Sequence, residues 1–241
     1  MTRSQFLATA IGISALSQIK CALPQTPFSK ELLLGKGKLD LRNDQVPLLE
    51  EAGSAFEKMQ QAAKAEGIQL KIVSAYRSYD RQKGIWNRKF KANAAAGLSP
   101  EKNIAKIITY STLPGTSRHH WGTDVDLIDG NPPAEGDVLV SQKFHNQGPY
   151  APMFEWMQKN AASYGFLLPY TNDAQRPGFY YEPWHYSYAP LSIPMLKAFL
   201  TLDLKTLLTP ADLLGKECVD EAFLKSYLQN NVLGIAAALK E

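Results

Sequence analysis

Residues 117–126 have the sequence SRHHWGTDVD, which places several metal-binding side chain types within a very short span. His119 and Asp126 are seven positions apart, and Gly122 lies between them. Because glycine adopts backbone conformations that other residues avoid, the chain can turn tightly between the two side chains. The segment therefore predicts two ligands of one metal site, with His120 as an alternative to its neighbour His119, since spacing alone does not distinguish them.

A second motif, EPWH at residues 182–185, supplies His185 with Glu182 three positions before it. The chain has only four histidines, and three of them lie in these two motifs. Two imidazoles and one carboxylate are the protein ligands of a catalytic zinc site, whose fourth position is left to water. A nearby glutamate can accept a proton from that water. The two motifs together predict a site for one zinc ion with Glu182 as the general base.

Arg77 is a further candidate, because it follows a predicted strand in the sequence SAYRS, residues 74–78. An arginine there can present a planar fork of donors to a carboxylate or to a developing oxyanion. Gln82 lies one helical turn further on and can add an amide donor. The alternative is a structural arginine that bridges strand and helix.

Hydrophobic periodicity predicts the fold class. Helices come first, then strands with polar residues at their ends, then more helices, which is an α+β order rather than a βαβ alternation. We expect a small antiparallel sheet that carries the zinc site and is flanked by helices, with a C-terminal helical extension. The predicted helices cover residues 46–66, 81–95, 101–110 and 149–164 and much of 191–241, and the predicted strands or extended segments cover 68–75, 123–128 and 179–188.

The N-terminus predicts export. A basic start at residues 1–3 precedes an uncharged stretch, residues 4–19, that is too short for a confident membrane span and resembles a signal peptide. The alternative is an N-terminal helix packed on the domain. We assign residues 1–22 to the signal and the start of a linker, 23–190 to a peptidase domain and 191–241 to the extension. Lys20 argues against a lipid anchor at Cys21, and a Cys21–Cys218 disulfide stays open.

The overall charge narrows the range of partners. A formal net charge of +3 without a basic run gives no argument for nucleic acid binding. We expect a monomer in the periplasm, the extracellular space or the cell wall, without a stable membrane anchor.

The two motifs and the SAYRS segment resemble the zinc D-alanyl-D-alanine carboxypeptidases and dipeptidases of the vancomycin-resistance type, over residues 33–188. The metal site of that group is similar to those of the lysostaphin-like and hedgehog-like zinc peptidases. The resemblance implies that His119, Asp126 and His185 bind zinc, that Glu182 is the general base, and that His119 rather than His120 is the ligand.

The same resemblance implies that Arg77, Gln82 and Ser117 hold the substrate peptide and its terminal carboxylate. The implied substrate is the stem peptide of peptidoglycan, from which the C-terminal D-alanine is removed. A dipeptidase or an endopeptidase is the alternative within the class, and a silent peptidoglycan-binding module is disfavoured because no ligand is lost. One departure is Asp124, where the family usually has alanine. Its carboxylate either tunes the zinc site or faces solvent.

Overall fold

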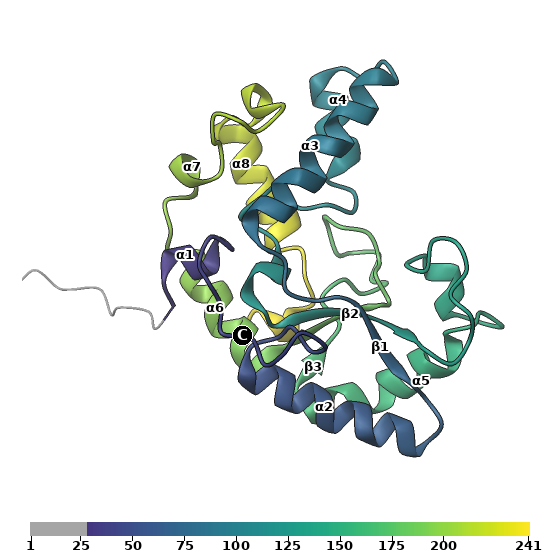
Figure 1. The fold of residues 1–241 in the computed structure, drawn as a ribbon. Coiled ribbons are helices and arrows are strands. Elements are labelled where there is room, and N and C mark those ends of the chain that lie inside the picture. Colours follow the sequence, from purple (N-terminus) through teal and green to yellow (C-terminus); the bar gives the residue numbers. More distant parts are fainter. Residues whose placement is uncertain (1–27) are drawn as a thin grey trace, which may run out of the picture.

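The computed structural model describes residues 28–241, which form one antiparallel sheet surrounded by helices (Figure 1). The sheet has the strand order β1-β2-β4-β3, and all three neighbouring pairs are antiparallel. The predicted α+β class is therefore confirmed. The strands are β1 (Leu70–Ser74), β2 (Asp124–Asp129), β3 (Phe166–Leu167) and β4 (His185–Tyr188).

Helices cover both sides of this sheet, with α2 on one side and the α3–α4 pair extending away on the other (Figure 1). The described α-helices are α1 (Lys30–Leu33), α2 (Glu50–Ala65), α3 (Tyr79–Ala95), α4 (Pro100–Ile107), α5 (Ala151–Asn160), α6 (Ala189–Phe199), α7 (Leu204–Leu207) and α8 (Glu221–Tyr227). None of the helices between residues 28 and 241 has the length and apolar composition that crossing a bilayer requires.

Local sequence explains where the two helices nearest the cleft begin. The Ser78 hydroxyl accepts a hydrogen bond from the Arg81 amide at the start of α3, and Ser99 does the same for Lys102 at the start of α4. Side-chain caps of this kind satisfy amides that have no partner within the helix. Pro100 occupies the first helical position of α4, where its missing N–H costs nothing.

Two clusters of buried side chains stabilise the fold. One lies between the sheet and the α2 and α5 helices and includes Phe56, Val125 and Trp156. The other joins α3 and α4 to the C-terminal helices, where Leu196 and Leu224 are buried. Residues 191–241 therefore share a buried apolar cluster with α3 and α4.

The C-terminal residues also brace the loop that leads to β4. The Arg176 guanidinium donates to the carbonyls of Phe179 at 2.6 Å, Gly234 at 2.8 Å and Thr171 at 3.2 Å. These bonds tie the loop that contains Glu182 to the end of the chain. Backbone carbonyls held by one charged donor have little freedom to move independently.

The structure differs from the sequence-based expectation mainly at element ends. The predicted helix 149–164 ends at Asn160 and continues as a 3-10 turn, Ala161–Tyr164, because Gly165 follows with a φ of 82°. The strand β3 was not predicted, since two residues carry no readable alternation. The signal peptide and Cys21 lie outside the described residues. Cys218 is half-buried and has no disulfide partner among the described residues, so its pairing with Cys21 stays open.

Tyr227 of α8 supports the loop before the SRHHWG motif. Its buried hydroxyl accepts from the Leu113 amide at 2.9 Å and lies 2.9 Å from the Thr116 hydroxyl. Replacing Tyr227 with phenylalanine leaves that amide without a partner, so we expect a loss of about 1–3 kcal/mol in the free energy of unfolding, measured by urea denaturation. The matched control is Tyr180→Phe, because Tyr180 is exposed. Equal stabilities of the two variants would contradict the bracing role.

Candidate metal centre and substrate cleft

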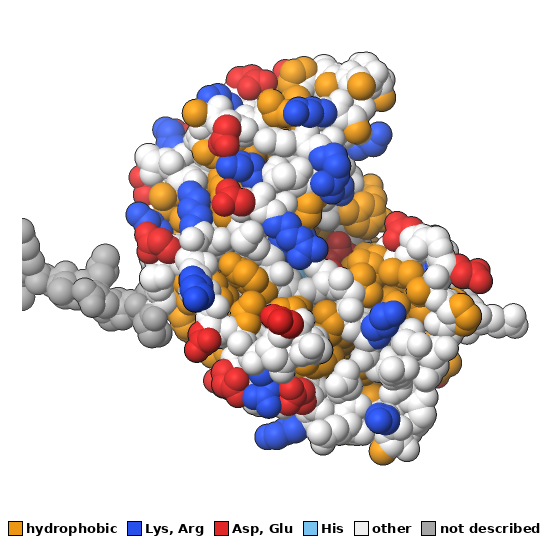
Figure 2. Space-filling model, in the orientation of Figure 1, with side chains coloured by type: hydrophobic (Ala, Val, Ile, Leu, Met, Phe, Trp, Pro, Cys, Tyr) orange, Lys and Arg blue, Asp and Glu red, His pale blue; other side chains and the backbone are white. Residues whose placement is uncertain are grey.

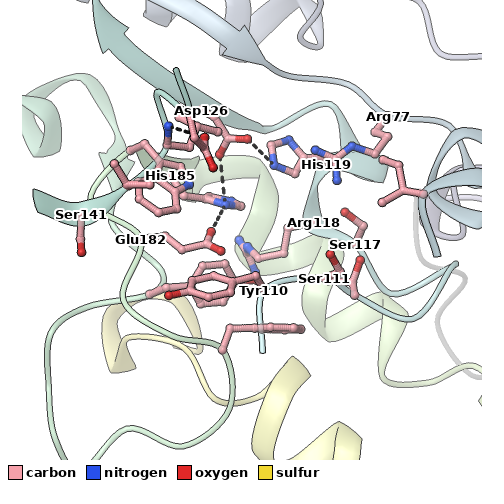
Figure 3. A pocket seen from close by; sticks show the side chains of 18 of the residues that line it. Arg77, Tyr110, Ser111, Ser117, Arg118, His119, Asp126, Ser141, Glu182 and His185 are labelled. Atoms are coloured by element: carbon pink, nitrogen blue, oxygen red, sulfur yellow. Dashed lines mark hydrogen bonds and ion pairs between the residues drawn. The ribbon is translucent and has the colours of Figure 1, made fainter. Parts of the chain in front are cut away.

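Three side chains converge at one buried point beside the sheet (Figure 3). His119 comes from the 3-10 helix Arg118–Trp121 (η1), while Asp126 and His185 are directly paired across β2 and β4. His119 Nε2 lies 3.3 Å from Asp126 Oδ2, and His185 Nδ1 lies 3.4 Å from Asp126 Oδ1. One potential ligand atom from each residue lies within 4.8 Å of the others. The structure thus brings together the three residues that the sequence predicted as ligands.

The turn at Gly122 makes this convergence possible. Gly122 ends η1 with a φ of 66°, in the left-handed region that residues with a side chain rarely adopt. A Cβ atom here would also lie 3.1 Å from the Leu39 side chain. The chain can therefore reverse from the 3-10 helix into β2 within a few residues, so His119 and Asp126 face each other.

The donor set fits a zinc ion. Asp126 Oδ1 is buried and has no hydrogen-bond partner, which is costly unless a cation or another donor satisfies it. His119 Nδ1 lies 2.8 Å from the Ala75 carbonyl, which can only accept a hydrogen bond. Nδ1 therefore carries a ring proton, which leaves Nε2, on the Asp126 side, as the nitrogen that could bind a metal. Two imidazoles and one carboxylate match the ligands of catalytic zinc.

His120 is excluded from ligation by its own hydrogen bonds. Its Nε2 accepts from the Gly115 amide at 3.1 Å, so its proton lies on Nδ1 and is donated to the Arg77 carbonyl at 2.5 Å. Burial lowers the pKa of His120 to about 3, so the ring is neutral. Both nitrogens are occupied by backbone groups, and His120 has a structural role.

Glu182 lies next to the ligands. Its Oε2 is 3.1 Å from His185 Nδ1, and its side chain lines the cleft although the residue is only 8% exposed. The His185 amide donates to the Glu182 carbonyl, which closes a tight turn through Pro183. A spacing of three residues therefore suffices to place the glutamate beside the histidine.

The carboxylates around His185 determine the charge of the site. Burial opposes protonation of the ring, but hydrogen bonds to Asp124 and Glu182 outweigh it and raise the pKa of His185 to about 10. Burial likewise opposes ionisation of Asp126, yet the neighbouring His119 holds the pKa of that carboxyl below its usual range. The pocket is thus built to hold positive charge among acidic groups, and a divalent cation would take over the role of the imidazolium.

Arg77 points into the cleft from the end of β1. Its guanidinium donates to Gln82 Oε1 and Ser74 Oγ, both at 2.9 Å, and its Nε is buried without a partner. Burial lowers the pKa of Arg77, and the nearby Asp126 carboxylate opposes this shift. The Arg77 amide also donates to the His119 carbonyl at 3.0 Å, which couples the position of the arginine to that of a metal ligand.

The other two predicted substrate residues lie at different depths. Ser117 lines the cleft. Gln82 is fully buried behind Arg77, and its amide nitrogen donates to the Thr112 carbonyl at 2.8 Å. Both ends of the Gln82 amide are hydrogen-bonded, so Gln82 does not line the cleft itself but contacts Arg77, which does.

The cleft has a volume of about 540 Å³ and lies between the α3–α4 pair and the segment that follows β2. Figure 2 shows the surface hollowed between these two parts, with apolar side chains on the rim and an acidic side chain inside. Arg118, Lys89 and Tyr110 also line it and were not singled out from the sequence. Of these, Arg118 was the most accessible to sequence reasoning, because it lies between Ser117 and His119.

Asp124 is fully buried, which excludes one of the two alternatives for its carboxylate, that it faces solvent. Its Oδ1 accepts from Arg118 Nε at 2.8 Å and lies 3.0 Å from His185 Nε2. Burial opposes ionisation of Asp124, but Arg118 and then His185 hold the pKa of its carboxyl well below its usual range. The Asp124 carboxylate therefore contacts the His185 ring from the side opposite to Asp126, the other candidate ligand.

Comparisons with known proteins point to one family. The family model VanY, D-alanyl-D-alanine carboxypeptidase, matches residues 45–191, which is more than half of the chain. The chain is 34% identical over 139 residues to the putative carboxypeptidase YodJ of Bacillus subtilis, covering 57% of this chain and 45% of that protein. It is 32% identical over 131 residues to the bifunctional D-Ala-D-Ala dipeptidase and carboxypeptidase VanXYC of Enterococcus gallinarum. That match covers 53% of this chain and 61% of VanXYC. The chain thus spans less than half the length of YodJ.

Solved structures share the fold. VanYB in complex with D-alanine-D-alanine aligns with a TM-score of 0.52 at 23% identity, covering 73% of this chain and 92% of that one. A mutant of the vancomycin-resistance D,D-pentapeptidase VanY in complex with Zn(II) aligns with a TM-score of 0.51 at 22% identity. That alignment covers 68% of this chain and 84% of the other. Since the family model matches more than half of the chain, including all four strands and the three candidate ligands, the chain belongs to the VanY family of D-alanyl-D-alanine carboxypeptidases.

Proposed function

We propose that this protein is a zinc-dependent carboxypeptidase that removes the C-terminal D-alanine from peptidoglycan stem peptides. The observation that carries the proposal is the convergence of His119, Asp126 and His185 with Glu182 on one buried wall of a cleft. The proposal also includes export of the protein and action as a monomer outside the cytoplasmic membrane, with residues 191–241 as part of the catalytic body.

Hydrolysis of a peptide bond needs a nucleophile, a proton acceptor and a group that stabilises the oxyanion. A bound zinc ion would supply Lewis acidity and a water molecule with a pKa near neutrality. Glu182 accepts the proton of the attacking water and delivers it to the nitrogen of the departing D-alanine. Attack of the water oxygen forms the new C–O bond and a tetrahedral oxyanion, and the C–N bond then breaks as the amine nitrogen takes the proton from Glu182.

The cationic side of the cleft orients the substrate. Arg77 presents its guanidinium near Asp126 and Glu182, where the scissile carbonyl must lie for Glu182 to act. Ser117 offers a hydroxyl to the peptide, and Gln82 keeps the Arg77 fork in place through a 2.9 Å hydrogen bond. Charge-assisted, pre-oriented donors of this kind stabilise an oxyanion more than a neutral carbonyl.

Replacing Arg77 with alanine should lower kcat by roughly 10²- to 10³-fold, the usual effect of losing one oxyanion donor, while zinc stays bound. The matched control is Arg81→Ala, four residues further along the chain at the start of α3, because Arg81 is exposed. Steady-state kinetics on a D-alanine-terminated peptide measure both variants. A raised KM with unchanged kcat in the Arg77 variant would show ground-state binding only and contradict the oxyanion role.

The decisive experiment is mass spectrometry of purified stem peptides after incubation with the protein. Loss of one terminal D-alanine in the untreated wild type, and not after chelation, is the expected result. Release of the dipeptide would favour the dipeptidase activity that VanXYC combines with carboxypeptidase activity. Internal cleavage would point to an endopeptidase, and unchanged peptides of every stem length would contradict the proposal.

A further inference from the structure

Asp124 occupies a buried position behind the metal ligands, where none of the catalytic steps above uses it. Four donors surround its carboxylate. Oδ1 is 2.8 Å from Arg118 Nε and 3.0 Å from His185 Nε2, and Oδ2 is 2.6 Å from the Thr123 hydroxyl and 3.0 Å from the Ser187 hydroxyl. A carboxylate with this many donors is fixed in one orientation.

The strand register explains this arrangement. Asp124 pairs with Ser187 and Asp126 pairs with His185 across β2 and β4. Side chains alternate between the two faces of a strand, so these four polar groups share one face of the sheet. Val125 and Tyr186 form the pair between them and belong to the buried apolar cluster on the other face.

From this geometry we propose that Asp124 is a positioning residue that sets the tautomer and orientation of the His185 ring. An ionised carboxylate can only accept hydrogen bonds, so the ring nitrogen that faces it, Nε2, must carry the proton. Nδ1 then faces Asp126 Oδ1 at 3.4 Å and Glu182 Oε2 at 3.1 Å, where a bound metal ion would take the place of a ring proton. Asp124 thus accepts a hydrogen bond from one ring nitrogen of His185, as the Ala75 carbonyl does from His119.

Arg118 holds Asp124 in turn. Its side chain is 5% exposed, its Nε bonds Asp124, and its Nη2 donates to the Ser187 hydroxyl at 2.6 Å. Ser187 also donates to Asp124, which closes a small buried ring of contacts. Figure 3 shows the Arg118 guanidinium on the same side of the cleft as His185 and Glu182. Since Asp124 offsets the charge of Arg118, the network adds no net charge beside the metal.

This inference rests on the metal site of the proposed function, and zinc binding tests it without reference to hydrolysis. Asp124→Ala should weaken zinc binding by about 10- to 100-fold in a chelator competition assay, the usual effect of losing the partner of a ligating histidine. The absorption spectrum of the cobalt-substituted protein should also change, because the ligand geometry is no longer fixed. Asp124→Asn keeps one acceptor oxygen, so we expect a smaller loss of at least about threefold.

Asp129→Ala is the matched control. Asp129 is another buried aspartate of β2, and it accepts hydrogen bonds from the Gln69 and Asn131 amides away from the ligands. Its loss should lower the melting temperature of the chelator-treated protein but leave zinc affinity and the cobalt spectrum unchanged.

The outcomes separate the two proposals. A folded Asp124→Ala protein with wild-type zinc affinity and cobalt spectrum would contradict the positioning role. If the Asp124→Ala protein does not fold, the Asp124→Asn protein provides the test. Wild-type zinc affinity in the Asp124→Asn protein would equally contradict the positioning role. Zinc binding by the wild type without peptide hydrolysis would instead contradict the carboxypeptidase function alone.

Discussion

Replacing Glu182 with alanine is expected to lower kcat by roughly 10²- to 10⁴-fold, the range that a positioned general base contributes. The Glu182 carboxylate lies 3.1 Å from His185 Nδ1, the nitrogen on the side of the metal site, and it lines the cleft. The other described acidic residues that line the cleft are the ligand Asp126 and Asp137. Because Glu182 is not one of the three ligands, the variant should still bind zinc. Kinetics on a stem peptide and metal analysis of the same sample measure the two quantities.

Glu182→Gln is the informative companion variant, because the amide keeps the size of the side chain and loses the ability to accept a proton. Both variants should be impaired to a similar extent. An alanine variant with wild-type kcat would rule out Glu182 as the general base. A variant that had lost zinc would instead assign the glutamate to metal binding.

Removing the Asp126 carboxylate should abolish zinc binding and reduce hydrolysis to the background rate. Zinc at about 1,000 times its dissociation constant stabilises a folded protein by about 4 kcal/mol, so the wild type should melt at a distinctly higher temperature with zinc than with a chelator. Asp126→Ala should show no such difference, because one of the three ligands is missing. Differential scanning calorimetry with and without zinc measures the effect.

Asp129→Ala again serves as the control, since it removes a buried carboxylate from the same strand without touching the ligands. It should keep the zinc-dependent rise in melting temperature. If Asp126→Ala also kept that rise, the metal would be held elsewhere, and the assignment of His119, Asp126 and His185 would be wrong.

Much of the site could be predicted because its parts are local in sequence. The seven-residue spacing of His119 and Asp126 around a glycine and the three-residue spacing of Glu182 and His185 each describe one turn of the chain. The α+β class followed from the order of periodic segments. A strand as short as Phe166–Leu167 could not be predicted, because its pairing with β4 rather than its own pattern makes it a strand.

The residues that support the site were harder to predict, because their partners are distant in the sequence. The sequence left His119 and His120 as alternatives, and the hydrogen-bond partners of their rings distinguish them. His120 is held by the Gly115 amide and the Arg77 carbonyl, while His119 has one nitrogen free toward Asp126. The position of Gln82 behind Arg77 depends on the packing of α3 against the 111–117 loop, where the Thr112 carbonyl accepts a hydrogen bond from the Gln82 amide.

By itself, the sequence determined the family and predicted the ligand types and the general base, since these depend on residue identity and short spacings. Only the tertiary structure decided the role of Asp124. Its contact with His185 joins residues that are 61 positions apart, and a shift of one residue in the β2–β4 register would move Asp124 to the opposite face. The packing of two strands, rather than any local pattern, therefore places a carboxylate behind the metal ligand.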